Sequence, residues 1–229
     1  MKILALETST DIASLALLCD GEVRSIRLAS PPAHSATLLP ALRQLLAEAQ
    51  LDLARLDVIA CGIGPGAFTG VRLACSVAQG LALGTDLPVA PVCSLLALAQ
   101  GQTADKVYCA MDARMNEAYV AAYQRENGRW LEVLAPACVT PTALPQPASD
   151  GWFGVGTAFS AYPLESAGSL AGKLCAEPLS AVPSAQAVAE LAALTGPAGW
   201  CDAALLAPLY VRDRIALTVA ERLAAGGKA

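Results

Sequence analysis

The sequence predicts an α/β fold in which a βββαβα unit occurs twice. Three observations support this prediction. Apolar segments with strand and helix periodicity alternate through the first 100 residues, the opening pattern recurs about 105 residues later, and a chain of 229 residues is long enough to bury a large core. The two copies place a boundary near residue 100.

The first copy begins with three short strands, and Asp20-Gly21 forms a tight turn between the second and the third, which indicates an antiparallel meander. Pro40 must lie in the first turn of the following helix or bend it. The expected elements are strands at 3–6, 14–19 and 23–28, a helix at 35–49, a strand at 56–63, a helix from a glycine-rich loop to about 83, a strand at 88–92 and a helix at 94–99.

The second copy repeats the landmarks of the first. The strand 107–111 ends in Asp112 as the first strand ends in Glu7, and Asn127-Gly128 stands where Asp20-Gly21 stands in the first copy. Duplication explains these matches, although two unrelated meanders remain an alternative. The rest is less regular: prolines mark a loop, and helices are expected at 184–194 and 216–225.

The composition and the charge of the chain exclude some classes of function. The net charge is −5 and the sequence pI is about 4.9, which is the wrong sign for a protein that holds nucleic-acid phosphates by itself. Mean hydropathy is +0.49, but no apolar run approaches the roughly 18 residues of a membrane span, and the apolar run after Met1-Lys2 is too short for a signal peptide. We therefore expect a cytoplasmic protein without a membrane partner.

The cysteines and the histidine predict no metal site. None of the eight cysteines forms a Cys-x-x-Cys pair, so we expect reduced, mostly buried thiols. The single histidine, His34, stands beside Ser35 at a predicted helix start, where a capping role is favoured over catalysis.

The glycine-rich loop 61–72 joins a predicted strand to a predicted helix and looks like a phosphate cradle. Its glycines permit positive φ and close backbone approach. However, the last glycine is followed by Val71-Arg72, so the Lys-Ser/Thr of a Walker loop is missing, and the dinucleotide pattern is not met either.

Five motifs resemble the bacterial TsaB (YeaZ) family and together cover nearly the whole chain. They are the segments 3–10, 34–40, 62–72, 112–114 and 208–212. The resemblance implies a subunit of the machinery that places a threonylcarbamoyl group on adenosine 37 of tRNAs reading codons that begin with A. It implies a heterodimer with a catalytic TsaD-type paralogue, a TsaE-type ATPase as a further partner, tRNA contact only through the complex, and a homodimer when the chain is alone.

The same resemblance implies a duplicated actin-like, ribonuclease H-like fold. It places one domain at 1–100 and a smaller one at 101–210, with a helix at about 211–225 packing back on the first. Active members of this superfamily keep an acid and hydroxyls for metal and phosphate after the first strand and at the glycine-rich loop. The corresponding residues of this chain are Glu7, Thr8, Thr10, Gly64, Gly66, Thr69 and Gly70. We expect this site to be vestigial and to hold no metal or cofactor, because Glu7 replaces the usual Asp.

The helix after the loop carries small side chains at every fourth residue, Gly70, Ala74, Ala78 and Ala82, which form one ridge. The ridge suits either a sheet of the same protein or a partner. The resemblance favours a partner and implies an interface made of Leu38, Leu39, Leu42, Leu46, Val71, Ala74, Cys75 and Ala78. A charge at position 74 or 78 is then expected to leave the monomer folded.

We therefore expect a non-catalytic scaffold that binds and activates the catalytic subunit. Two alternatives stay open. One is a stand-alone ATP-dependent enzyme that uses Glu7, Thr8, the loop 62–70 and Asp112. The other is a self-associating binding module that uses the same helices.

Overall fold

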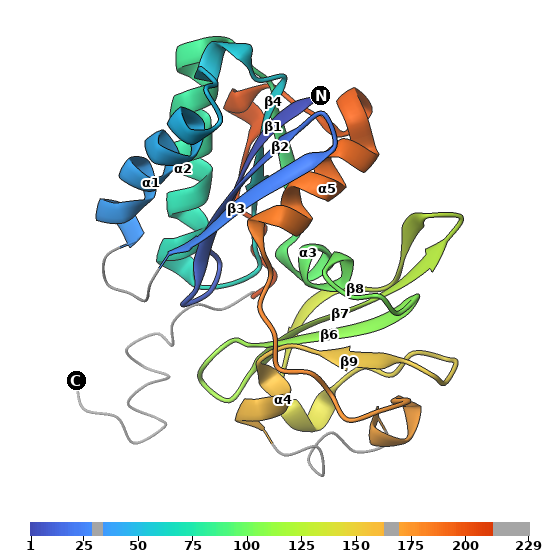
Figure 1. The fold of residues 1–229 in the computed structure, drawn as a ribbon. Helices are drawn as coiled ribbons and strands as arrows, with labels where there is room; N and C mark the ends of the chain where they lie inside the picture. Colours follow the sequence, from blue (N-terminus) through green and yellow to red (C-terminus); the bar gives the residue numbers. More distant parts are fainter. Residues whose placement is uncertain (29–33, 163–169, 213–229) are drawn as a thin grey trace, which may run out of the picture.

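The computed structural model describes residues 1–28, 34–162 and 170–212, and it divides them between two mixed β-sheets (Figure 1). In the first sheet the order is β3-β2-β1-β4-β5, with β1 antiparallel to β2 and parallel to β4. Its strands are β1 (Lys2–Glu7), β2 (Ala13–Cys19), β3 (Glu22–Leu28), β4 (Val58–Gly62) and β5 (Val89–Val92). The predicted opening meander is confirmed.

Helices cover both faces of the first sheet. On one face lie α1 (His34–Glu48) and α2 (Phe68–Thr85), and on the other lies α5 (Ala185–Thr195), as Figure 1 shows. Because alternate residues of a strand point to opposite faces, Leu4 and Leu6 of β1 pack toward α1 and α2, whereas Ile3 and Ala5 pack toward α5. This two-sided burial explains why β1, β2 and β4 are apolar at almost every position, whereas the edge strand β3 is mostly polar and exposed.

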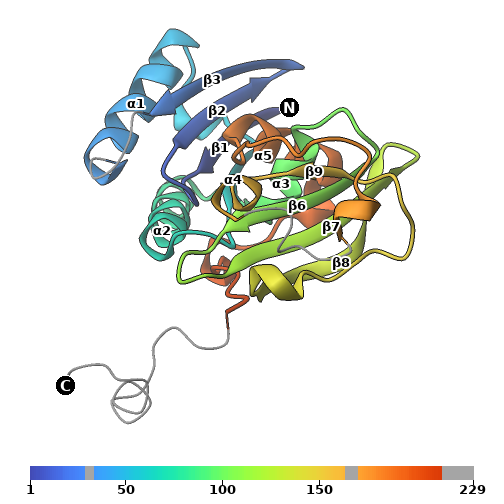
Figure 2. The same ribbon diagram turned by 90° about the horizontal axis from the view of Figure 1, so that it is seen from below.

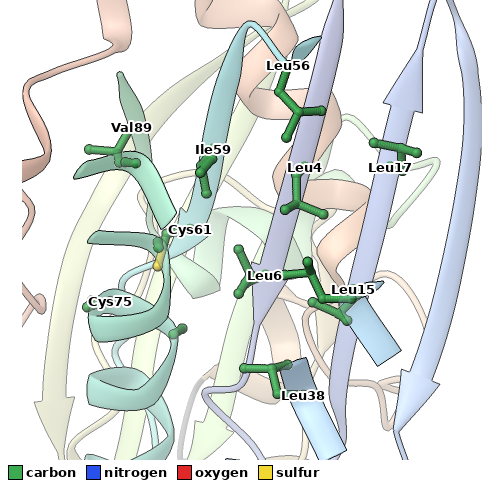
Figure 3. Close-up of a cluster of buried hydrophobic side chains, with 14 of the residues drawn as sticks. Leu4, Leu6, Leu15, Leu17, Leu38, Leu56, Ile59, Cys61, Cys75 and Val89 are labelled. Atoms are coloured by element: carbon green, nitrogen blue, oxygen red, sulfur yellow. The ribbon is translucent and has the colours of Figure 1, made fainter. Parts of the chain in front are cut away.

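The cluster beneath α1 and α2 is built mainly from leucines (Figure 3). Leu38 of α1 reaches toward Leu6 and Leu15, while Cys61 of β4 lies beside Cys75 of α2. All five side chains are almost fully buried. Pro40 lies at the seventh position of α1, beyond the first turn, and the helix continues through it.

The second sheet repeats the topology of the first in shorter form. Its order is β8-β7-β6-β9, again an antiparallel meander whose first strand pairs in parallel with a later one. The strands are β6 (Lys106–Asp112), β7 (Ala118–Glu126), β8 (Arg129–Val139) and β9 (Phe153–Val155). Both meanders turn through a left-handed pair, Asp20-Gly21 at φ 49° and 94° and Asn127-Gly128 at φ 50° and 75°. The predicted repeat of the meander is confirmed.

The two units are joined through α3 (Ser94–Gln100), which contacts β6, β7 and α5. Figure 1 shows α3 between the two sheets, and in the view from below it overlaps the second sheet (Figure 2). The short α4 (Ala158–Ala161) packs on β6. Helix α5 falls within the range 101–210 that the sequence analysis gave to the second domain, yet its main contacts are with β1 and β2 of the first sheet. The expected terminal helix at 211–225 lies outside the described residues.

Within the described ranges, no helix combines the length and the apolar character needed to cross a bilayer.

Candidate functional site

A cleft of about 560 Å³ opens between the two units. One wall consists of the turn after β1 and the loop before α2, and the other consists of the end of β6. The chain passes between these walls at 209–212, and Arg212 ends the described part of the chain there. Of the seven residues expected to form a vestigial phosphate site, Thr10 and Gly66 line this cleft.

Glu7 lies beside this cleft but does not line it. Its side chain is fully buried, and each carboxylate oxygen accepts one hydrogen bond: Oε1 from the Ser9 amide at 2.7 Å and Oε2 from the Ser94 hydroxyl at 2.8 Å. Burial raises the pKa of Glu7, and the hydrogen bonds from Ser9 and Ser94 oppose that shift. The carboxylate therefore connects β1 to α3 within the protein.

The glycine-rich loop is closed against the turn that follows β1. The amide of Ala67 donates to the Ser9 carbonyl at 2.7 Å, and the amide of Gly64 donates to the Ser94 hydroxyl at 3.2 Å. A Cβ at Gly66 would overlap that same Ser9 carbonyl. Two of the amides that an anion would need are thus already occupied.

The hydroxyls near the loop also bond to the protein's own backbone. Thr8 Oγ1 donates to the Gly70 carbonyl at 2.6 Å, and Thr10 Oγ1 donates to the Ile12 carbonyl at 3.1 Å. Thr69 stands exposed in the first turn of α2. The loop glycines serve two purposes: Gly64 adopts φ +93°, and Gly66 and Gly70 allow close backbone contact.

The charged groups on the opposite wall form ion pairs, one of them across the cleft. Nη2 of Arg114 lies 3.1 Å from Oδ2 of Asp11, across the cleft. Nη1 of Arg114 lies 3.8 Å from Oδ2 of Asp112. Arg212 forms an ion pair with Glu117 at 2.6 Å. Asp112, which the alternative enzyme would use, thus pairs with Arg114.

An aromatic and cationic cluster at the cleft mouth was not predicted. The guanidinium carbon of Arg72 lies 3.6 Å from the ring centre of Phe68, and its Nε donates to the Tyr210 hydroxyl at 2.7 Å. Phe68 and Tyr210 also stack on each other at 6.2 Å. The spacing of four residues between Phe68 and Arg72 was the available signal, since such pairs share a helix face.

The predicted interface residues require a correction. Of the eight side chains, only Leu39 is exposed, at 43%. The other seven are buried in the core of this chain: Leu38, Leu42, Leu46, Val71, Ala74, Cys75 and Ala78. The small-residue ridge faces the protein's own sheet because small side chains let α2 lie close to the strands. A charge at position 74 or 78 would therefore be buried and would unfold the monomer.

No group of three or more metal-ligating side chains occurs among the residues that the structure describes. The side chain of His34 lies outside the description, as does that of Ser35.

Comparison with known proteins identifies the relatives of this chain. The family described as "TsaD: tRNA N6-adenosine threonylcarbamoyltransferase" matches residues 28–212. The tRNA threonylcarbamoyladenosine biosynthesis protein TsaB of Haemophilus influenzae is 37% identical, over 94% of this chain and 95% of that protein. The protein of the same name from Escherichia coli is 40% identical, over 71% of this chain and 74% of that protein.

A solved structure gives the same result. "YeaZ from Pseudomonas aeruginosa" superimposes with a TM-score of 0.81 at 36% identity, and the match covers 91% of this chain and 100% of that one. Together with the two sheets, this likeness confirms the predicted duplicated actin-like α/β fold. By sequence and fold, the chain belongs to the TsaB (YeaZ) family.

Proposed function

We propose that this chain works in the biosynthesis of threonylcarbamoyladenosine in tRNA, as a non-catalytic subunit that binds and activates a TsaD-type threonylcarbamoyltransferase. The names of its relatives support the process, and the TsaD family match supports a paralogous partner. The acidic net charge of −5 fits a subunit that meets tRNA only through the complex.

One observation supports the non-catalytic role: the polar groups of the candidate site form hydrogen bonds within the protein itself. The buried carboxylate of Glu7 accepts from Ser9 and Ser94, and the loop amides of Gly64 and Ala67 bond within the chain. A nucleotide site needs such an acid and such amides free to meet metal and phosphate. Binding a nucleotide here would first require these contacts to break.

The surface that we propose to bind the catalytic subunit is the outer helix face, which we define as the residues of α1 and α2 that point away from the first sheet. Its residues are at least partly exposed: Leu39, Leu73, Ser76, Val77, Gly80 and Gly84. A Cβ built at Gly80 or Gly84 meets no other atom within 4 Å. A helix of a partner can therefore approach closely between the flanking apolar side chains, as in a packed helix pair.

The test places an arginine on this face. Gly80→Arg adds bulk and charge where the structure leaves space, and it replaces a poor helix former, so the monomer is expected to stay folded. Gly172→Arg is the matched control, because Gly172 is also exposed and also has no atom near its Cβ. The measurements are copurification with the catalytic subunit and threonylcarbamoylation of tRNA by the reconstituted complex.

We expect Gly80→Arg to lose both copurification and modification, while Gly172→Arg keeps both. A folded Gly80→Arg variant that binds and activates normally would rule out this face. The alternatives have their own readouts: Mg-ATP hydrolysis by the isolated chain would support the enzyme, and a homodimer that competes with the catalytic subunit would support self-association. The TsaE-type partner and the cytoplasmic location remain proposals that rest on the family.

A further inference from the structure

A second groove lies at the far end of α2 from the interdomain cleft. Its volume is about 520 Å³, and it is formed by the last turn of α2, the segment 86–88 that leads to β5, and residues of the segment 197–203. Its walls combine apolar side chains with polar groups, and the rim carries two acids. The lining residues are Ala82, Leu83, Asp86, Leu87, Pro88, Pro197, Trp200, Cys201, Asp202 and Ala203.

Hydrogen bonds hold the walls of this groove in place. The Gln79 side chain donates to the carbonyls of Ala203 and Leu206, both at 3.0 Å, and so ties α2 to the segment beside it. Val89 and Cys201 exchange backbone hydrogen bonds of 2.9 and 2.8 Å. The groove is therefore formed before any ligand arrives, which lowers the entropic cost of binding.

Three negative features surround the groove. Asp86 and Asp202 are both exposed, and neither forms a salt bridge with another residue in the described ranges. The third feature is the C-terminal end of α2, an 18-residue helix with no basic side chain in its last turn. The helix dipole makes such an end attractive to a cation, although the Leu81 and Ala82 carbonyls already accept from Thr85 Oγ1.

Two large apolar side chains of the groove, Leu83 and Trp200, favour one kind of cation over another. Leu83 is 69% exposed at one side of the groove, and the half-buried ring of Trp200 lines it with its indole nitrogen turned to the Ala192 carbonyl at 3.2 Å. A guanidinium group stacks on aromatic rings and bonds carboxylates in a planar, two-pronged geometry, whereas an ammonium group is compact and strongly hydrated. An arginine suits these walls better than a lysine.

We infer that this groove is a docking site for a protein segment that presents an arginine beside an apolar residue. The guanidinium lies between Asp86 and Asp202 at the end of α2, and the apolar neighbour packs against Leu83. The site is separate from the interdomain cleft and does not depend on the role proposed for the outer helix face.

The experiment titrates the full chain with a minimal probe, acetyl-Arg-Leu-amide, and follows the backbone amide signals and the Trp200 indole signal by NMR. Acetyl-citrulline-Leu-amide is the matched ligand control, since citrulline keeps the shape of arginine without its charge. The Asp86→Asn/Asp202→Asn double variant removes both rim charges. Asparagine still tolerates the left-handed backbone of Asp86 and still caps the turn that Asp202 begins.

Glu22→Gln is the matched protein control, because Glu22 is an exposed acid on β3, at the opposite edge of the sheet from β5. We expect the arginine probe to shift groove signals at millimolar concentrations, the double variant to bind it about tenfold more weakly, and Glu22→Gln to bind it normally. Equal binding of the citrulline probe, unchanged binding by the double variant, or shifts confined to other surfaces would each overturn the inference.

Discussion

Replacing Gly70 by alanine tests whether the close approach of α2 to the turn after β1 stabilises the fold. Glycine to alanine inside an exposed helix normally raises the free energy of unfolding by about 0.5–1 kcal/mol. At Gly70, however, the new methyl would overlap the Thr8 carbonyl, a backbone atom that a rotamer change cannot move. Overpacking of this kind costs about 1–3 kcal/mol.

The displaced helix would also stretch the 2.6 Å hydrogen bond from Thr8 Oγ1 to the Gly70 carbonyl, whose loss costs about 1 kcal/mol more. Allowing for the helix propensity gained, we expect Gly70→Ala to lower the free energy of unfolding by about 1–3 kcal/mol. Gly80→Ala in the same helix meets no atom within 4 Å and should raise it by up to about 1 kcal/mol.

Urea unfolding followed by far-UV circular dichroism measures both variants. Since the two variants share one helix and one chemical change, the difference between their free energies of unfolding isolates the contact at Thr8, and we expect it to be about 1–4 kcal/mol. If Gly70→Ala proves as stable as Gly80→Ala, the loop does not pack as described, and the argument for a closed phosphate cradle fails with it.

Two further predictions concern charged groups. Burial raises the pKa of Glu7 above its ordinary value of 4.5, so the unfolded chain loses this proton at lower pH than the folded one. The free energy of unfolding of the natural chain, relative to that of Glu7→Gln, should therefore fall as pH rises from 4.5 toward the raised pKa. Urea unfolding of both proteins at several pH values measures this. A difference in free energy between the two proteins that stays constant with pH would contradict the prediction. Arg212→Met should destabilise the chain by about 1–3 kcal/mol, because it leaves Glu117 without its partly buried partner. Arg114→Met, at an exposed pair, should cost less than about 1 kcal/mol by thermal or urea unfolding, and equal losses would refute the distinction.

Strand and helix positions were largely predictable because local patterns determine them. The Asp-Gly and Asn-Gly turns specified both meanders, and the expected helix at 184–194 appears as α5 at Ala185–Thr195. Which sheet α5 would cover was not predictable from its periodicity, since an amphipathic pattern shows which face of a helix is buried but not what it is buried against.

The candidate site was predictable in its location and less so in its contacts. The glycine spacing correctly indicated close backbone approach, but it did not show that the Ser9 carbonyl, rather than an anion, would fill the loop. Ser94 lies 87 residues from Glu7 in the sequence, and no local pattern connects a hydroxyl with a carboxylate at that separation. The resemblance implied that the ridge at Ala74 faces a partner. The sequence could not correct this expectation, because an apolar helix face has the same pattern whether a sheet or a partner covers it.

The packing of α5 on the first sheet has a consequence for how the chain matures on the ribosome. The strands of that sheet are complete at residue 92, but the helix that covers their second face ends at residue 195. At about 5–20 residues per second, translation takes roughly 5–20 s to supply the missing cover. During that interval Ile3, Ala5 and Val58 face solvent. A nascent chain of this length is a natural client for a chaperone, and a gene fragment that stops near codon 100 encodes a sheet with one side bare.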